Sequence, residues 1–233
     1  GKLPKGTYAL TYGNLPWAFM SLLYGAGGTL ENDMDDLTKD VWRKPMEKLK
    51  EAYDAGVIAP MDVDGEQAFG SGKAVFAQLG TWAQGNMSNT LGADKIAEAN
   101  TLQYSADNPV NFFYQCNWMQ LKDPHRSAAK SAAAADFVKY VYEHWMDWSE
   151  VGSISPAYRD LNNPEYQKLI QASFTNSKKE RDYIKTSNYL YGGYATAGWG
   201  TYNDIVYGNV GLEEGLKTLD LMAQGQIEIQ EES

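Results

Sequence analysis

The sequence of 233 residues has little of several residue types, and each shortage excludes a class of protein. Its single cysteine, Cys116, excludes an intramolecular disulfide and argues against a zinc cluster. The two histidines, His125 and His144, have no neighbours that suggest catalysis, so we interpret them as surface or helix-end residues. We interpret Cys116 as a small buried side chain. No metal centre and no cofactor are predicted.

Basic residues are also scarce, because 20 Lys and Arg stand against 30 Asp and Glu, giving a formal net charge of −10. Nucleic-acid binding depends on neutralising phosphates with Lys and Arg, so this charge argues against a nucleic-acid partner. An acidic membrane surface is disfavoured for the same reason. No apolar run approaches the roughly 18 residues that a membrane-spanning helix requires, and the N-terminal residues do not have the pattern of a signal peptide.

Aromatic residues, in contrast, occur where the chain turns. Trp17 and Trp82 follow strand-like runs, and Trp199 lies between two glycines. The segment 188–202 interleaves tyrosines with glycines; glycine lets a backbone approach a ligand, and aromatic rings supply flat faces. Sugars present C–H faces that stack on such rings and hydroxyls that pair with polar side chains. These positions therefore favour a site for a flat ligand. The remaining tryptophans at helical spacing are assigned to the core: Trp42, Trp145 and Trp148.

Local patterns predict an alternation of strands and helices. β-branched and aromatic residues favour strands at 7–12, 74–79, 101–105 and 111–121. Apolar spacing favours helices at 17–24, 37–55, 66–71, 125–148, 163–174 and 212–223. Pro45 is expected to kink or break its helix, and the tail 228–233 to fray. The buried face of the helix at 125–148 is predicted to contain Ala134, Phe137, Val138, Val141 and Trp145.

Two loops resemble known binding motifs but have the wrong residues. The run 70–73 resembles a phosphate loop, yet Gln67 stands where the first glycine belongs and Ala74 replaces the required Ser or Thr. The acidic turn 33–36 lacks the alternate ligands, the sixth-position glycine and the twelfth-position glutamate of an EF-hand. We interpret the acidic turn as solvated, with a helix-capping role.

The order of several motifs resembles the later part of a bacterial extracellular solute-binding protein of the carbohydrate ABC transporter family (family 1 type). The most specific stretch resembles the signature F-x-x-G-K-A-A-[ML] followed by G-x-W, and it reads Phe69-Gly70-Ser71-Gly72-Lys73-Ala74-Val75-Phe76 and then Gly80-Thr81-Trp82. The other matching stretches are Asn14-Leu15-Pro16-Trp17 with 24–28, Asn117-Trp118-Met119-Gln120-Leu121-Lys122 with 133–137, the loop 152–156, and Leu212-Glu213-Glu214-Gly215-Leu216.

This resemblance implies an α/β fold, a periplasmic-binding-protein-like (type II) lobe that is helix-rich, with a mixed sheet flanked by helices. Proteins of the family are considerably longer and enclose their ligand between two lobes. The whole chain, 1–233, then corresponds to the C-terminal lobe. Its first segment is 1–108, its second segment is 156–233, and 109–155 is a hinge-return segment that belongs to the missing N-terminal lobe. In this chain, 109–155 either packs locally or is exposed.

The resemblance also implies a function without catalysis, as the substrate-binding component of an ABC importer that binds a carbohydrate, above all an oligosaccharide. The implied partners are the sugar, the permease transmembrane subunits and the missing N-terminal lobe. The implied location is the extracellular face of the membrane, as a lipoprotein, or the periplasm. The expected ligand-binding residues are Trp82, Trp17, Trp199, Trp118, Asn117, Asn14 and Tyr202; for Asn14, capping of its helix is the alternative role.

Other functions stay open at this point. A stand-alone lectin-like module would use the same aromatic residues. A glycoside hydrolase would need two carboxylates about 5–10 Å apart, and none of the available ones lies in a recognisable motif: Glu31, Asp62, Asp64, Glu66 and Asp204. The sequence does not name the solute, which leaves peptides and polyols as further candidates.

Overall fold

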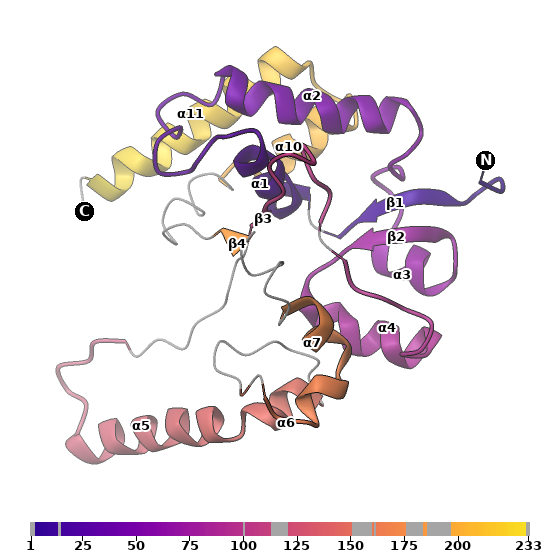
Figure 1. Cartoon of the computed structure of the whole chain (residues 1–233). Coiled ribbons are helices and arrows are strands. Elements are labelled where there is room, and N and C mark those ends of the chain that lie inside the picture. The colour runs from indigo at the N-terminus through magenta and orange to yellow at the C-terminus, as the bar shows by residue number, and fades with distance from the viewer. Residues whose placement is uncertain are drawn as a thin grey trace. The chain divides into compact units, whose positions relative to one another are not determined.

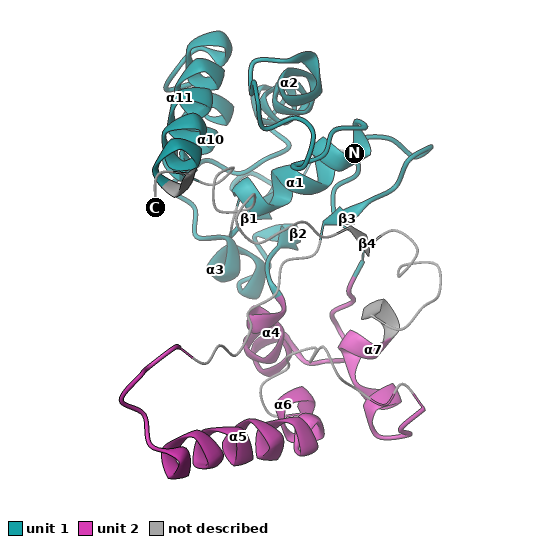
Figure 2. Ribbon diagram, turned by 90° about the vertical axis from the view of Figure 1, so that its left-hand side faces the viewer, with its two compact units in different colours: residues 1–80, 99–113, 182–233 teal, residues 81–98, 114–181 magenta. Residues whose placement is uncertain are grey.

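The computed structural model describes residues 3–13, 15–99, 101–112, 121–150, 160, 162–175, 184–185 and 197–231. These residues form two compact units (Figure 2). Unit 1 draws on 1–80, 99–113 and 182–233, and unit 2 on 81–98 and 114–181. The lobe segments expected from the sequence (1–108, 109–155 and 156–233) have other boundaries than these two units, and they stay a prediction. Within the described ranges, no helix has the length and apolar character to cross a membrane.

Unit 1 combines short strands with longer helices (Figure 1). Its elements in chain order are β1 (Tyr8–Tyr12), α1 (Leu15–Gly25), α2 (Asp40–Asp54), α3 (Gly65–Gly70), β2 (Ala74–Gln78), β3 (Asn111–Phe112), β4 (Ile184–Lys185), α10 (Trp199–Val206) and α11 (Leu212–Glu231). The strand predicted at 101–105 is absent from the structure. α11 extends to Glu231, so the prediction that the acidic tail frays is wrong for 228–231.

The described strands pair only in parallel, which differs from the mixed sheet that was expected. β1 pairs with β2 from Tyr8↔Ala74 to Tyr12↔Gln78, and β3 pairs with β4. A parallel pair of strands needs a crossover connection. The connection from β1 to β2 contains α1, α2 and α3. β2 was expected to be buried, but Val75 and Phe76 are 51% and 64% exposed. Burial of strand side chains depends on the elements that pack over the faces of the sheet, and composition alone does not predict these.

The core of unit 1 surrounds α1. Nearly every residue of α1 is buried, which confirms the interpretation of 17–24 as an apolar helix. Phe19 stacks on Trp42 of α2, with ring centroids 5.6 Å apart, and also packs against Tyr202 of α10 at 5.4 Å. Trp42 is therefore a core residue, as predicted. Of the kink or break expected at Pro45, the break is wrong, because α2 continues through that residue.

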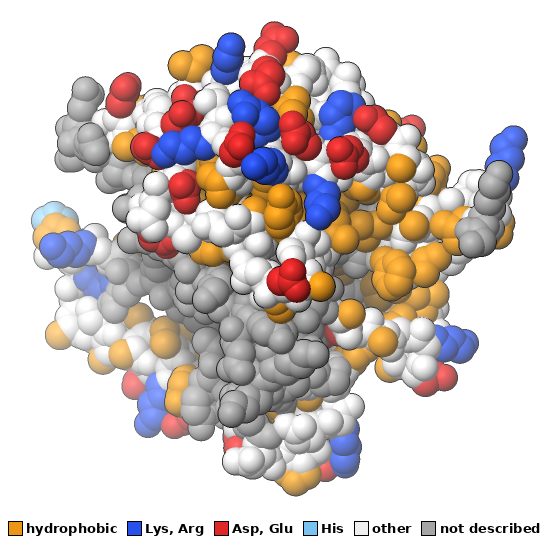
Figure 3. All heavy atoms as spheres, turned by 45° about the horizontal axis from the view of Figure 1, so that its top comes forward, with side chains coloured by type: hydrophobic (Ala, Val, Ile, Leu, Met, Phe, Trp, Pro, Cys, Tyr) orange, Lys and Arg blue, Asp and Glu red, His pale blue; other side chains and the backbone are white. Residues whose placement is uncertain are grey.

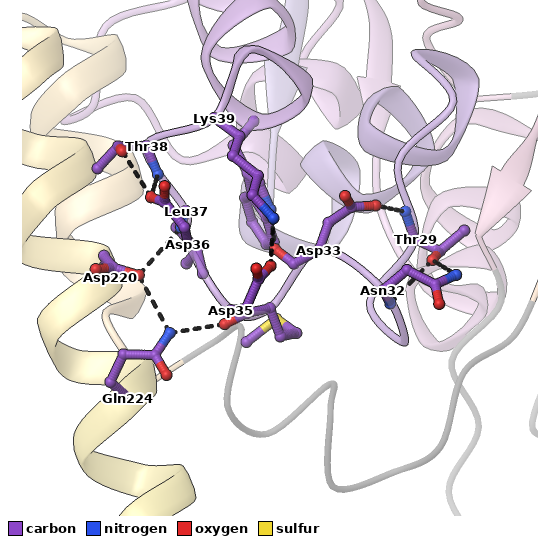
Figure 4. A network of polar contacts seen from close by, with 12 residues as sticks. Thr29, Asn32, Asp33, Asp35, Asp36, Leu37, Thr38, Lys39, Asp220 and Gln224 are labelled. Atoms are coloured by element: carbon purple, nitrogen blue, oxygen red, sulfur yellow. Dashed lines mark hydrogen bonds and ion pairs between the residues drawn. The ribbon is translucent and has the colours of Figure 1, made fainter.

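The acidic turn between α1 and α2 is held by the chain's own donors (Figure 4). The Asp33 carboxylate accepts from the Thr29 N–H at 2.8 Å, and Asp36 accepts from the backbone and side chain of Thr38. α11 continues the network, because Asp220 accepts from the Leu37 N–H at 3.0 Å and the Gln224 amide donates to the Met34 carbonyl at 2.7 Å. The acidic turn is therefore joined to α11 by hydrogen bonds at Leu37 and Met34. Among the described residues, no group of three His, Cys, Asp or Glu could hold a metal ion.

Charges on the visible face of Figure 3 are interspersed and do not gather by sign. Much of this mixing follows α2, where Arg43 pairs with Asp40 and with Glu213 of α11, both at 2.8 Å. Lys50 pairs with Asp54 one turn further along the helix, at 3.0 Å. Such a face does not present the basic stripe that marks a nucleic-acid interface.

Unit 2 is helical in its described residues. It contains a 3₁₀ turn η1 (Thr81–Ala83), α4 (Gln84–Leu91), α5 (Ala128–Glu143), α6 (Trp145–Glu150), a second 3₁₀ turn η2 (Tyr166–Lys168) and α7 (Ile170–Thr175). The long helix predicted at 125–148 is thus two helices that meet at His144. α5 has no buried residue, and its predicted core side chains Phe137 and Val138 are exposed. The assignment of Trp148 to the core is also wrong, since 40% of it is exposed.

The hydroxyl of Tyr12 is buried and has no hydrogen-bond partner among the described residues. An unpaired buried donor costs about 1–3 kcal/mol, so we expect Tyr12→Phe to raise the free energy of unfolding by about 1 kcal/mol at pH 7. Burial, and then the neighbouring Tyr207, raise the pKa of Tyr12 above its ordinary value of 10.0. The wild-type chain therefore loses stability as the pH rises past 10, where only the unfolded phenol ionises.

Urea denaturation of both proteins at pH 7 and near pH 11 tests this prediction. The advantage of Tyr12→Phe should grow at the higher pH. A variant that is less stable than wild type at pH 7 would show that the hydroxyl has a stabilising partner.

Candidate ligand-binding site

Two of the predicted tryptophans lie together in unit 1. Trp17 is the third residue of α1 and Trp199 is the first residue of α10. Their ring centroids are 5.8 Å apart with an interplanar angle of 70°, an edge-to-face arrangement. Trp17 is partly buried and Trp199 is 37% exposed. The two rings thus form a corner that is partly open to solvent, which we call the tryptophan corner.

The start of α1 places Trp17 just beyond the carboxyl end of β1. After Tyr12 the Gly13 N–H donates to the Gln78 carbonyl of β2 at 3.0 Å, so the two strands stay joined at this end. A Cβ at Gly13 would lie 2.7 Å from Leu79 Cδ2, so the Leu79 side chain would have to shift to admit one. In open α/β sheets, ligands bind outside the carboxyl ends of the strands. The tryptophan corner follows that edge in the chain.

No charged side chain lies on the helical segments that carry the two rings. α1 contains neither acidic nor basic residues, and the first turn of α10 reads Trp199-Gly200-Thr201-Tyr202. A flat, uncharged aromatic surface suits ligands that bind through C–H faces and few charges. α1 and the first turn of α10 therefore offer apolar contact and carry no charged side chain of their own for a carboxylate or phosphate.

Tyr202 was expected to contact ligand, and the structure places it elsewhere. The residue is fully buried against Phe19, and burial raises the pKa of its phenol above the ordinary 10.0. Because the ring has no exposed face, Tyr202 is part of the core that joins α10 to α1. Its contribution to the tryptophan corner is to support Trp199 one turn earlier on the same helix.

Trp82 belongs to unit 2, where η1 carries it, and it is 61% exposed. The next helix begins with Gln84, which is buried and donates from Nε2 to Oε1 of Gln171 at 2.6 Å. Gln171 in turn donates to the Ser149 carbonyl at 2.8 Å. This buried chain of amides fixes the start of α4 beside an exposed indole. Trp82 is thus exposed, and its contact with a ligand stays a prediction.

The remaining predicted site residues, Asn14, Asn117 and Trp118, lie outside the described residues, and so does Cys116. A separate surface hollow of about 220 Å³ is lined by Ala26, Asp40, Val41, Lys44 and Tyr104. Ligand pockets are usually about 300–1,000 Å³, and Lys44 already pairs with Asp40 at 3.1 Å. This hollow is therefore smaller than a usual ligand pocket, and its basic side chain is already paired.

Comparison with solved structures shows the fold. The chain is similar to the cyclic α-maltosyl-1,6-maltose binding protein of Arthrobacter globiformis, with 16% identity, a TM-score of 0.65, and coverage of 95% of this chain and 60% of that one. It is also similar to UgpB of Mycobacterium tuberculosis in complex with glycerophosphocholine, with 14% identity, a TM-score of 0.71, and coverage of 97% and 60%. A third match is the maltose/maltodextrin-binding domain MalE of Bdellovibrio bacteriovorus bound to maltotriose, with 15% identity, a TM-score of 0.64, and coverage of 98% and 62%.

These likenesses confirm the expected fold class, a periplasmic-binding-protein-like α/β lobe. The chain spans about three fifths of the solved chains that it matches. No protein-family model matches the sequence, and no curated protein is similar enough to it to match. At these low identities, what the solved proteins bind is a property of those proteins, and the assignment to this chain is a proposal.

Proposed function

We propose that this chain is a sugar-contacting lobe of a solute-binding protein, in which Trp17 and Trp199 stack on an oligosaccharide. The tryptophan corner carries the proposal, because it pairs two large rings just beyond a strand end, on helical segments without charge. Aromatic rings and a few polar groups are the usual lining of a small-molecule site. Two of the solved proteins with this fold bind maltose-type sugars.

The proposal extends to the rest of the protein's function. The lobe delivers its sugar to the transmembrane subunits of an ABC permease and catalyses no reaction itself. It works on the extracellular face of the membrane, held by a lipid anchor, or in the periplasm. The support is the fold, which the chain shares with binding proteins. A stand-alone lectin-like module is the alternative that uses the same rings without a permease.

The exposed face of α5 supports the division into lobes. α5 has sixteen residues and none is buried. Isolated helices of this length are marginal in water, because most helical stability in proteins comes from packing. We therefore assign 109–155 to a second, N-terminal lobe that covers Phe137 and Val138 in the complete protein.

A quaternary ammonium ligand is a second candidate for the same corner. Two indole rings at 70° offer adjacent faces, and such aromatic corners bind ammonium groups through cation–π attraction. The solved structure of UgpB holds glycerophosphocholine in a protein of this fold. The phosphodiester of that ligand would, however, need a donor set that α1 and the first turn of α10 do not supply.

Trp199→Ala tests the proposed function. One lost stacking contact of about 1–1.5 kcal/mol should weaken maltotriose binding about tenfold in isothermal titration calorimetry. The matched control is Trp148→Ala, which removes an equally exposed indole from unit 2 and should leave the affinity unchanged. Glycerophosphocholine is titrated in parallel. Tighter binding of that ligand would favour the ammonium reading, and an unchanged affinity for maltotriose in Trp199→Ala would refute the stacking role.

A further inference from the structure

Gly198 lies at the point where α10 begins against α11. It is the N-cap residue of α10, directly before Trp199, and it is buried. Its φ of −91° is ordinary for any residue, so the backbone conformation does not require glycine. Space does: an added Cβ would lie 2.5 Å from Leu219 Cδ2 and 3.1 Å from Met222 Sδ.

Leu219 has little room to yield to such a Cβ. Its side chain is 1% exposed, and the next residue, Asp220, accepts from the Leu37 N–H at 3.0 Å. One turn further on, Gln224 donates to the Met34 carbonyl at 2.7 Å. The hydrogen bonds drawn in Figure 4 thus fix this stretch of α11 against the acidic turn. A side chain at position 198 would therefore displace the start of α10 rather than α11. Trp199 is the first residue of that helix and would move with it.

We propose that Gly198 is a positioning residue for the tryptophan corner. By having no side chain, it lets α10 begin in contact with Leu219, and this contact holds the Trp199 ring edge-to-face with Trp17 at 5.8 Å. The same chain offers a contrasting glycine on the other side of Trp199. Among the described residues, nothing lies within 4 Å of a Cβ built at Gly200, so packing against them does not require glycine there. The effect of Gly198 on ligand affinity rests on the proposed function, while its effect on the rings does not.

The test compares Gly198→Ala with Gly200→Ala by circular dichroism, because two close indoles give an exciton couplet that depends on their mutual geometry. Trp17→Phe defines the signal without the pair. Gly198→Ala should reduce the couplet toward the Trp17→Phe level, whereas Gly200→Ala should keep it. In titrations with maltotriose, Gly198→Ala should lose about tenfold in affinity, the loss expected for Trp199→Ala, and Gly200→Ala should bind as wild type does.

Two further outcomes keep the inference separate from general misfolding and from the proposed function. Leu219→Val removes the Cδ2 atom that obstructs the new methyl group, so the pair Gly198→Ala with Leu219→Val should regain the couplet even if Gly198→Ala alone does not fold. An intact couplet in Gly198→Ala, or a folded double variant without one, would overturn the inference. If wild type shows the couplet but binds no maltotriose, the proposed function is wrong. The positioning role of Gly198 is then decided by the couplets of the variants alone.

Discussion

Trp42→Ala should remove about 3–5 kcal/mol from the free energy of unfolding of unit 1, the usual cost of truncating a large buried aromatic side chain. The indole is fully buried and stacks on Phe19 at 5.6 Å with an angle of 24°. Its Nε1–H also donates to the Asp33 carbonyl at 2.7 Å. Alanine leaves a cavity under α1 and an unpaired carbonyl at the acidic turn, and each adds to the loss.

Urea denaturation followed by far-UV circular dichroism measures this loss. A domain has only about 5–15 kcal/mol of stability in total, so the variant should unfold at a much lower urea concentration. Phe76→Ala is the matched control, because it removes a ring from unit 1 that is 64% exposed, and surface changes usually stay within about 0.5 kcal/mol. Similar losses for the two variants would mean that Trp42 does not anchor the core.

Local patterns in the sequence were sufficient for the elements that decide their own structure. β1 follows from a run of β-branched and aromatic residues, and α2 from an apolar stripe at helical spacing, with Trp42 and Met46 fully buried as that stripe predicts. The sequence predicts a kink or break at Pro45, but α2 continues through it, because burial of the apolar stripe outweighs the one backbone hydrogen bond that a proline at this position cannot donate. α2 begins at Asp40, so Pro45 lies in its second turn.

Partners distant in the chain decide what local patterns do not. β2 has the composition of a buried strand, yet the burial of its side chains depends on which elements pack over the faces of the sheet, and Phe76 is 64% exposed. α5 has an apolar face at helical spacing, but spacing does not say whether another element covers that face. Phe137 lies on that apolar face and is nevertheless exposed, which its spacing in the sequence does not predict.

The candidate site was predicted in part. The turn positions of Trp17 and Trp199 marked both residues, but their edge-to-face contact depends on how α10 packs on α1 through Phe19 and Tyr202. The glycines beside Trp199 were interpreted as room for a ligand. The structure gives Gly198 a different reason, which is the close approach of α11. A sequence alone does not distinguish these two uses of glycine, because both need only a missing side chain.

The same distinction predicts opposite effects for two glycines within α11. Alanine is favoured over glycine in a helix by about 1 kcal/mol. At Gly225 no described residue lies within 4 Å of an added Cβ, so Gly225→Ala should stabilise unit 1 by about 0.5–1 kcal/mol. At Gly215 the Cβ would lie 2.2 Å from Ile205 Cγ1, an atom of a fully buried side chain on α10. Overpacking a core costs about 1–3 kcal/mol, occasionally more, and a contact this short belongs at the upper end.

Gly215→Ala should therefore be a net loss of about 2 kcal/mol, despite the better helix propensity of alanine. Urea denaturation of the two variants under identical conditions measures both signs, and each variant serves as the control for the other. Two stabilised variants would show that α10 can move away from α11 at little cost. That result would also weaken the case for Gly198, because the same pair of helices would then tolerate a methyl group between them. Opposite signs would instead show that the spacing of α10 and α11 is fixed along the length that positions Trp199.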